Sequence, residues 1–242
     1  MALSKDSISP YDAYFAAILG VDQATTPSHK RTTMIYDVHS HNYPTVPGTA
    51  IVQLTPEAFH PQTGHFYSVG LHPWDIRDDW RTQMSKLLVM ALHTHVVMIG
   101  ETGLDKKNSS TPIDVQMEVF REHIRLSELI RKPLIVHCVK AFDELLAIRK
   151  EMKAQRPWII HGFRGGIEQW KQLHRAGLYM SIGHSYNPEL IKTIDPEHLL
   201  LESDVFNDIE TIYDLVSSTN NLEVSTLKHH VASNIHHILT HI

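Results

Sequence analysis

Apolar runs of four to six residues recur along the chain, and each run ends in polar residues. Near-continuous apolar runs of this length are typical of parallel strands that are buried on both faces. The eight runs are Met34–His39, Ala50–Leu54, Phe66–Leu71, Val96–Gly100, Leu134–His137, Trp158–His161, Leu178–Ile182 and Leu199–Glu202. They predict a sheet of eight parallel strands.

The stretches between the later runs have the apolar spacing of amphipathic helices. The expected helices are Trp80–His95, Pro112–Arg131, Phe142–Gln155, Ile167–Ala176, Pro188–Ile194, Asp208–Ser217 and Val224–Ile242. Strand–helix alternation repeated eight times predicts an α/β fold, a (β/α)8 TIM barrel. The segment between His41 and Phe66 is short and rich in proline, so we expect loops or single turns where the early helices would be.

Composition narrows the class of protein. Of the 242 residues, 42% are hydrophobic and 20% are charged, which is ordinary for a globular chain with a substantial core. The net charge of -5 gives no sign of the basic surface of most nucleic-acid binders, although a metal could supply positive potential locally. We expect residues 1–33 to be an N-terminal extension without assigned chemistry, and residues 34–242 to form the barrel.

The compartment follows from cysteine usage and hydropathy. Cys138 is the single cysteine, so the chain has no internal disulfide, which fits a reducing cytoplasm. Its alternation with His137 places the thiol toward the helix layer, as a structural residue. No apolar stretch is long enough to span a bilayer, and the N-terminus lacks the apolar core of a signal peptide. We expect a cytoplasmic protein without membrane contact; protein partners are not indicated.

Polar residues that bind metals stand at the ends of the apolar runs. In DVHSH, the side chains of Asp37, His39 and His41 share one face of an extended strand, and paired imidazoles can hold a divalent ion. The strand-end residues are His39, His41, His72, Glu101, His137, His161 and Asp204. Functional groups of barrels gather at the carboxyl ends of the strands. A single strand-end histidine is more often a hydrogen-bonded core residue, but the whole series favours a metal site.

The chain resembles the TatD-type metal-dependent hydrolases of the amidohydrolase-like superfamily. The resemblance lies in DVHSH (37–41), GLHPW (70–74), IGETGLD (99–105), KPLIVHC (132–138), IIHGFRGG (159–166) and LLLESD (199–204). It implies that one or two divalent metal ions (Zn, Mn or Mg) are bound, with Glu101 bridging two, by His39, His41, Glu101, His137, His161 and Asp204. It also implies a deoxyribonuclease of the exonuclease type, so DNA or another phosphodiester is the expected substrate. Cys138-Val139 and Arg164 depart from the usual family pattern, which affects the substrate pocket more than the ligands.

The expected catalytic residues are Asp204 and Glu101. Metal-activated water attacks phosphorus in this hypothesis, and Asp204 accepts its proton. By strand parity, Glu202 and Asp37 are expected to orient ligand histidines, with a buried ion pair as the alternative for Glu202. The candidate substrate contacts are His72, Trp74, Lys140, Arg164 and His184. Each of these five also has a structural or solvated-loop alternative.

Two other functions remain open. The first is hydrolysis of a small phosphate ester, or of another small ester or amide. Relatives with carbonyl substrates commonly carry a modified lysine on a middle strand, where this chain has Glu101, and this disfavours a carbonyl substrate. The second is a degenerate barrel that serves as a binding scaffold, which the intact set of six ligand-type residues disfavours.

Overall fold

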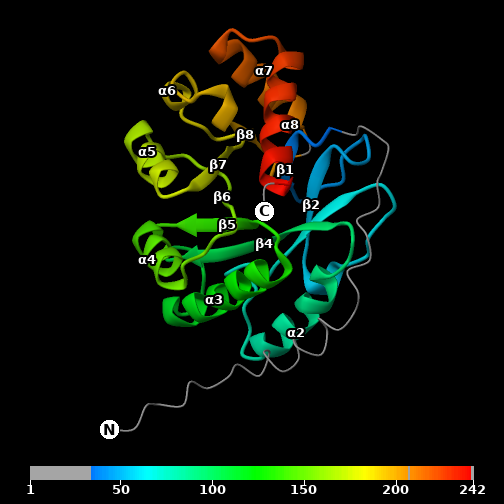
Figure 1. The fold of residues 1–242 in the computed structure, drawn as a ribbon, viewed down its shortest axis with the longest axis vertical. Coiled ribbons are helices and arrows are strands. Elements are labelled where there is room, and N and C mark those ends of the chain that lie inside the picture. The colour runs from blue at the N-terminus through cyan, green and yellow to red at the C-terminus, as the bar shows by residue number, and fades with distance from the viewer. Residues whose placement is uncertain (1–33, 207, 241–242) are drawn as a thin grey trace. The chain divides into compact units, whose positions relative to one another are not determined.

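A computed structural model describes residues 34–206 and 208–240 (Figure 1). The predicted extension at residues 1–33 lies outside the described residues. Eight parallel strands are hydrogen-bonded in chain order from β1 to β8. They are β1 (Asp37–Ser40), β2 (Ala50–Leu54), β3 (Phe66–Val69), β4 (Val96–Asp105), β5 (Leu134–Val139), β6 (Trp158–Ile160), β7 (Leu178–Ile182) and β8 (Leu200–Leu201).

The sheet closes between its first and last strands. Ser40 and Asp204 form a parallel bridge. The N–H of Asp204 donates to the carbonyl of His39 (3.0 Å), and the N–H of His41 donates to the carbonyl of Asp204 (2.8 Å). The predicted (β/α)8 barrel is therefore confirmed, and its closure brings together three of the expected ligands.

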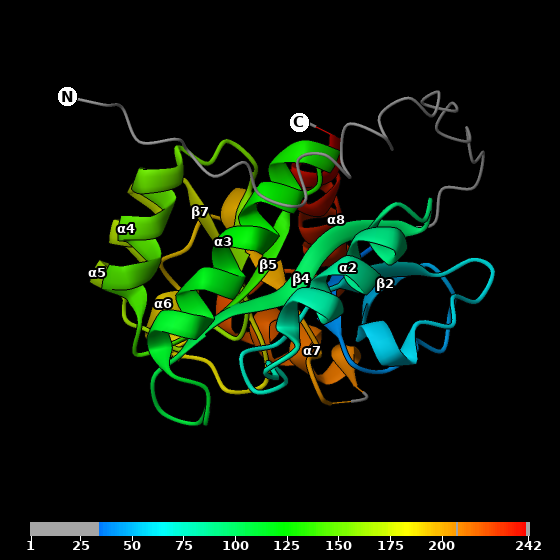
Figure 2. The same ribbon diagram turned by 90° about the horizontal axis from the view of Figure 1, so that it is seen from below.

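Helices cover the outside of the barrel (Figure 2). They are α2 (Trp80–Ala91), α3 (Ile113–Ile130), α4 (Phe142–Met152), α5 (Ile167–Arg175), α6 (Pro188–Ile191), α7 (Ile209–Asn220) and α8 (Val224–Thr240), with the 3-10 turns η1 (Pro56–Ala58) and η2 (Pro196–His198). Between β1 and β3 the described residues contain η1 as their one helical element, as the short proline-rich segment predicts. None of the described helices could cross a membrane.

Several elements differ in length from the sequence prediction, and three of these differences have a visible cause or consequence. The helix expected at Trp80–His95 ends at Ala91, where the ammonium of Lys132 donates to the last carbonyl. Helix α6 has four residues, because Thr193 turns back through an N–H bond to Leu190 (2.9 Å). Strand β4 continues for five residues beyond Gly100 to Asp105, and after a register shift Thr102 to Asp105 pair with β5. The longer β4 carries Glu101 and Asp105 to the end of the barrel where the carboxyl ends of the strands meet, which we call the upper end.

A close approach between β4 and β5 explains one of the glycines in the GETG segment. Gly103 lies opposite His137 and has a φ of 142°, in the region that glycine favours. A Cβ at this position would lie 2.0 Å from the carbonyl oxygen of His137. Only glycine allows the two strands to stay paired here, with Glu101 and His137 on neighbouring strands.

His123 links α3 to the loop that follows β3. It is fully buried, its Nδ1 donates to the carbonyl of Val119 (2.8 Å), and its Nε2 accepts the N–H of Leu71 (3.0 Å). Burial lowers the pKa of His123 from 6.5 to about 4, and the Val119 hydrogen bond only partly offsets this. The imidazole is therefore neutral in the native state at neutral pH, and it holds the residue next to His72 in place.

We expect this histidine to make native stability fall as the pH falls. Between pH 6.5 and pH 4 the unfolded chain binds a proton at His123 that the native chain does not bind. The loss approaches about 3 kcal/mol at pH 4. Urea unfolding of the metal-free protein at several pH values measures this loss of unfolding free energy. His123→Gln is the comparison, because glutamine does not titrate in this pH range. Parallel pH profiles for the two proteins would contradict the assignment.

Candidate metal centre

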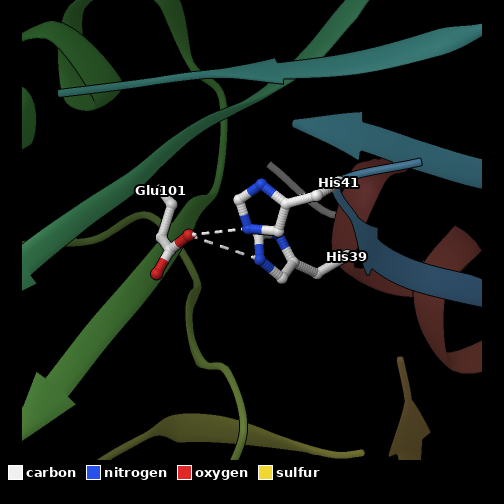
Figure 3. Close-up of side chains that lie close together, drawn as sticks. All are labelled: His39, His41 and Glu101. Atoms are coloured by element: carbon white, nitrogen blue, oxygen red, sulfur yellow. Dashed lines mark ion pairs between the residues drawn. The ribbon is translucent and has the colours of Figure 1, made fainter. Parts of the chain in front are cut away.

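The carboxylate of Glu101 lies at the centre of the upper end of the barrel, and its side chain is only 4% exposed. One oxygen, Oε2, faces His39 on β1 and His41, which follows β1 (Figure 3). It lies 3.4 Å from Nε2 of His39 and 3.3 Å from Nε2 of His41. Alternation along the extended chain puts both imidazoles on the same side, as the DVHSH pattern predicts.

The other oxygen of Glu101, Oε1, faces three further imidazoles. It lies 3.2 Å from Nε2 of His72, 3.0 Å from Nδ1 of His137 and 2.7 Å from Nε2 of His161. Five imidazoles from four strand ends therefore surround one buried carboxylate. His72, which the sequence suggested as a substrate contact, lies inside this cluster beside the ligand candidates.

Asp204 is the second carboxylate of the cluster. Its Oδ1 lies 3.5 Å from Nε2 of His41 and 3.8 Å from Nε2 of His39. The residue has a φ of 53°, a left-handed conformation, which the two backbone bonds to β1 hold in place. Its side chain is 25% exposed, so it faces solvent as well as the imidazoles. Glu101 is enclosed, whereas Asp204 stands at the opening.

Charge at the centre favours an added cation. Burial raises the pKa of Glu101, but the charge of His161 and hydrogen bonds from His137 and His161 outweigh it and hold the pKa well below its usual value. Burial lowers the pKa of His161, but the charge of Glu101 and its hydrogen bond raise it well above the usual value. The carboxylate is therefore ionised, and without a metal the cluster attracts protons instead.

The nitrogen atoms of the cluster fit a metal ion better than they fit each other. Among the described residues, neither ring nitrogen of the fully buried His39 has a hydrogen-bond partner. Nδ1 of His137 and Nε2 of His161 face each other at 3.2 Å. Three overlapping groups have ligand atoms within 4.8 Å of one another and could hold an ion: His39, His41 and Glu101; His39, His161 and Asp204; His72, Glu101 and His137. Imidazole and carboxylate donors of this kind suit divalent transition metals.

Glu202 and Asp37 lie in different surroundings, although strand parity suggested one role for both. Oε1 of Glu202 lies 3.4 Å from Nδ1 of His161, and its other oxygen accepts the hydroxyl of Ser181. Asp37 accepts the backbone N–H of Ser203 (3.0 Å) and, among the described residues, hydrogen-bonds no imidazole. An irregularity in β1 between Asp37 and Ser40 breaks the alternation on which the parity argument rests. Burial raises the pKa of Asp37 to about 7.

A cavity of about 560 Å³ opens beside the cluster. Its lining includes His137, His161 and Asp204 together with three of the candidate substrate contacts, Trp74, Lys140 and Arg164. His184 does not line it; its ring stacks on Phe206 at a centroid distance of 4.4 Å. Cys138 borders the cavity instead of facing only the helix layer, and burial raises the pKa of its thiol to about 12. The thiol is thus a poor nucleophile.

Sequence reasoning missed two polar residues that touch the cluster. Oε1 of Gln53 accepts the backbone N–H of Glu101 (2.6 Å) and the hydroxyl of Ser68 (2.8 Å), which fixes the backbone at the central carboxylate. Gln53 is the polar residue in the otherwise apolar run of β2, and this break in the pattern could have indicated its role. Asp105 lies 3.2 Å from Nε2 of His137. It has the same parity as Glu101, but the strand was expected to end at Gly100.

Comparisons with known proteins agree with this geometry. The family model described as TatD related DNase matches residues 48–235, which include Glu101, His137, His161 and Asp204. The uncharacterized metal-dependent hydrolase YabD of Bacillus subtilis is 32% identical over 147 residues, which are 57% of this chain and 58% of that protein. The 3'-5' ssDNA/RNA exonuclease TatD of Citrobacter rodentium is 31% identical over 149 residues, or 57% of this chain and 56% of that protein.

A solved structure shows the same fold. The crystal structure of YJJV, a TatD homolog from Escherichia coli K12, superposes with a TM-score of 0.70 at 18% identity, over 86% of this chain and 99% of that one. The chain spans less than three fifths of the length of the two curated relatives described above. Because the family model nevertheless covers most of the barrel and the strand-end histidines and acids converge on one centre, this chain belongs to the TatD-related DNase family.

Proposed function

We propose that this protein is a divalent-metal-dependent phosphodiesterase that removes nucleotides from the ends of DNA. The cluster around Glu101 supports this activity most directly, because five imidazoles and two carboxylates offer more ligands than one ion needs. By its name, the exonuclease TatD of Citrobacter rodentium acts on single-stranded DNA and RNA, which makes single-stranded nucleic acid the first substrate to test.

In this proposal, the two oxygens of Glu101 divide the ligands into two groups. His39, His41 and Asp204 would hold one ion on the side of Oε2. His137 and His161, with His72 beside them, would hold a second on the side of Oε1. Glu101 would be shared. Imidazole-rich donor sets accept Zn²⁺ and Mn²⁺ readily and Mg²⁺ weakly, so we expect Zn²⁺ or Mn²⁺ to bind more tightly than Mg²⁺.

The residues of the chain have separate tasks in this reaction. Divalent ions held here would supply Lewis acidity to a phosphodiester and lower the pKa of water to about 7. Asp204 would accept the proton of the attacking water, because its side chain is 25% exposed and borders the cavity, whereas that of Glu101 is 4% exposed. Glu101 would hold ions and take no proton.

The cavity would bind the substrate beside the cluster. Its volume of about 560 Å³ is within the usual range for small-ligand sites. Lys140 and Arg164 would meet phosphate oxygens, and Trp74 would stack on a base. His184 is a weaker candidate because its ring is stacked on Phe206. The cytoplasmic location favoured by the single cysteine remains a prediction.

A turnover screen tests the proposal. Protein purified without a histidine tag is reconstituted with Mn²⁺, Zn²⁺ or Mg²⁺ and offered single-stranded DNA, a small phosphodiester and a phosphomonoester. We expect progressive shortening of the DNA that stops when a chelator removes the metal. Activity on the phosphomonoester alone would replace this function by hydrolysis of small phosphate esters. Less than one equivalent of bound metal, with no turnover, would favour a binding scaffold.

A further inference from the structure

Asp105, at the end of β4, is a buried carboxylate with an unusual number of donors. It is fully buried. Oδ1 accepts the backbone N–H groups of Lys107 and Asn108, both at 2.8 Å. Oδ2 accepts the indole N–H of Trp74 (2.8 Å), the side-chain amide of Asn108 (3.2 Å) and lies 3.2 Å from Nε2 of His137. With every lone pair engaged, Asp105 has none left for a metal ion.

The contact with Asp105 would decide which nitrogen of His137 carries the proton once the other nitrogen binds a metal ion. A carboxylate can only accept, so Nε2 of His137 is the N–H donor. Nδ1 lies 3.0 Å from Oε1 of Glu101, a second acceptor, and without an ion it donates there as well. If Nδ1 binds a metal ion, the one remaining proton is on Nε2, where Asp105 accepts it. His161 is arranged in the same way, since its Nδ1 faces Glu202 and its Nε2 faces Glu101. With a metal ion at the centre, each imidazole would keep its proton toward the carboxylate behind it and present its lone pair to the ion.

The same carboxylate anchors a tryptophan that is largely exposed. Trp74 is 54% exposed, yet its indole N–H is held by Asp105 at 2.8 Å. Its ring packs edge-to-face on His72 (4.8 Å between centroids) and on His137 (5.9 Å). The indole lines the cavity beside the cluster. An exposed aromatic ring with a fixed orientation at a cavity wall is suited to stack on a planar ligand.

We propose that Asp105 is a positioning residue that fixes His137 and Trp74 together, so that the indole forms a stacking wall for a nucleobase next to the metal centre. The nucleobase rests on the proposed function, whereas the anchoring of the two side chains does not. Asp105 therefore links metal affinity to substrate orientation. Asp105 itself is not a metal ligand in this proposal. Its Oδ2 holds both the imidazole of His137 and the indole of Trp74.

Nuclear magnetic resonance of the wild-type protein tests the anchoring first. The chain has four tryptophans, and Trp74→Phe assigns the indole signal of Trp74. We expect that signal to lie downfield of a solvent-exposed indole and to exchange with water at least tenfold more slowly. Nitrogen spectra of His137 should show the proton on Nε2. A proton on Nδ1 in the metal-loaded protein, or a freely exchanging indole, would overturn the proposal without any need for a mutant to fold.

Asp105→Asn tests the link between the two side chains. The amide keeps one acceptor oxygen. The two backbone N–H groups of Lys107 and Asn108 favour that oxygen in the position of Oδ1, which turns the NH2 group toward Trp74 and His137. We expect Mn²⁺ affinity to fall by about 10- to 100-fold and the indole exchange to accelerate in the same variant. Glu202→Gln is the matched control, because it removes a carboxylate from His161 without touching Trp74. It should weaken Mn²⁺ binding and leave the indole signal unchanged. Unchanged Mn²⁺ affinity or an unchanged indole in Asp105→Asn would contradict the proposal.

Binding of single-stranded DNA tests the stacking wall. Trp74→Ala should weaken binding to the metal-loaded protein by about 5- to 150-fold, the range for loss of one stacked base. Its Mn²⁺ affinity should stay within twofold, because Asp105 still holds His137. If wild-type protein binds metal but neither binds nor cleaves DNA, the proposed function fails, while the indole and metal measurements still decide the role of Asp105. Unchanged DNA affinity in Trp74→Ala would remove the stacking wall.

Discussion

Asp204→Asn is expected to lower the turnover of single-stranded DNA by about 10²- to 10⁴-fold, the usual contribution of a general base. Asparagine keeps the size of the side chain and one oxygen toward His39 and His41, so metal binding should weaken far less than turnover. The lost property is the ability to take a proton at the opening of the cavity. Initial rates at saturating metal, together with the metal content of each protein, separate the two effects.

Asp208→Asn is a suitable control for this variant. It makes the same chemical change four residues away, where the exposed Asp208 caps α7 by accepting the N–H of Thr211 (3.1 Å). Its turnover should stay within twofold of wild type. Equal turnover in Asp204→Asn would remove Asp204 from the proton-accepting role. A parallel loss of metal and turnover would leave it as a ligand only.

Glu101→Gln is expected to lower the affinity for the divalent metal by on the order of 10²-fold or more. The substitution removes the one charge that both groups of imidazoles face, and breaking a buried charge pair commonly costs about 3 kcal/mol or more. In its place the amide presents a donor to nitrogens that need an acceptor or a cation. Calorimetric titration of each protein with Mn²⁺ measures the change in metal affinity.

A second measurement on Glu101→Gln needs no metal. In the metal-free wild type, the charge and hydrogen bond of Glu101 raise the pKa of His161. Without that charge the pKa of His161 should fall, although Glu202 still raises it, and a proton-resonance titration detects the fall. Glu202→Gln should have a smaller effect on the metal, about 10- to 100-fold, because it acts through His161. Retention of two tightly bound equivalents by Glu101→Gln would show that the central carboxylate is not a shared ligand.

The sequence alone was sufficient for the barrel and for most of the cluster. Apolar runs that alternate with helical patterns follow from local spacing, and parallel strands place their carboxyl ends on one rim. This reasoning brought His39, His41, Glu101, His137 and His161 to one end of the sheet, where the structure has them within hydrogen-bond or ion-pair distance of Glu101. The positions of these residues depend on where each strand ends and on which face each side chain points to, and short segments specify both.

Tertiary structure decided what parity and strand ends could not. The length of β4 depends on pairing with β5, and Gly103 permits that pairing, so Asp105 reaches His137 although its run of apolar residues ends earlier. The pairing of β1 with β2 is irregular between Asp37 and Ser40, and Asp37 accepts the N–H of Ser203. The ring of His184 stacks on Phe206 and does not line the cavity. His72 comes after β3, and its place inside the cluster depends on how the loop packs against α3. Local sequence specifies which residues stand at a strand end, but contacts between segments far apart in the chain decide where their side chains point.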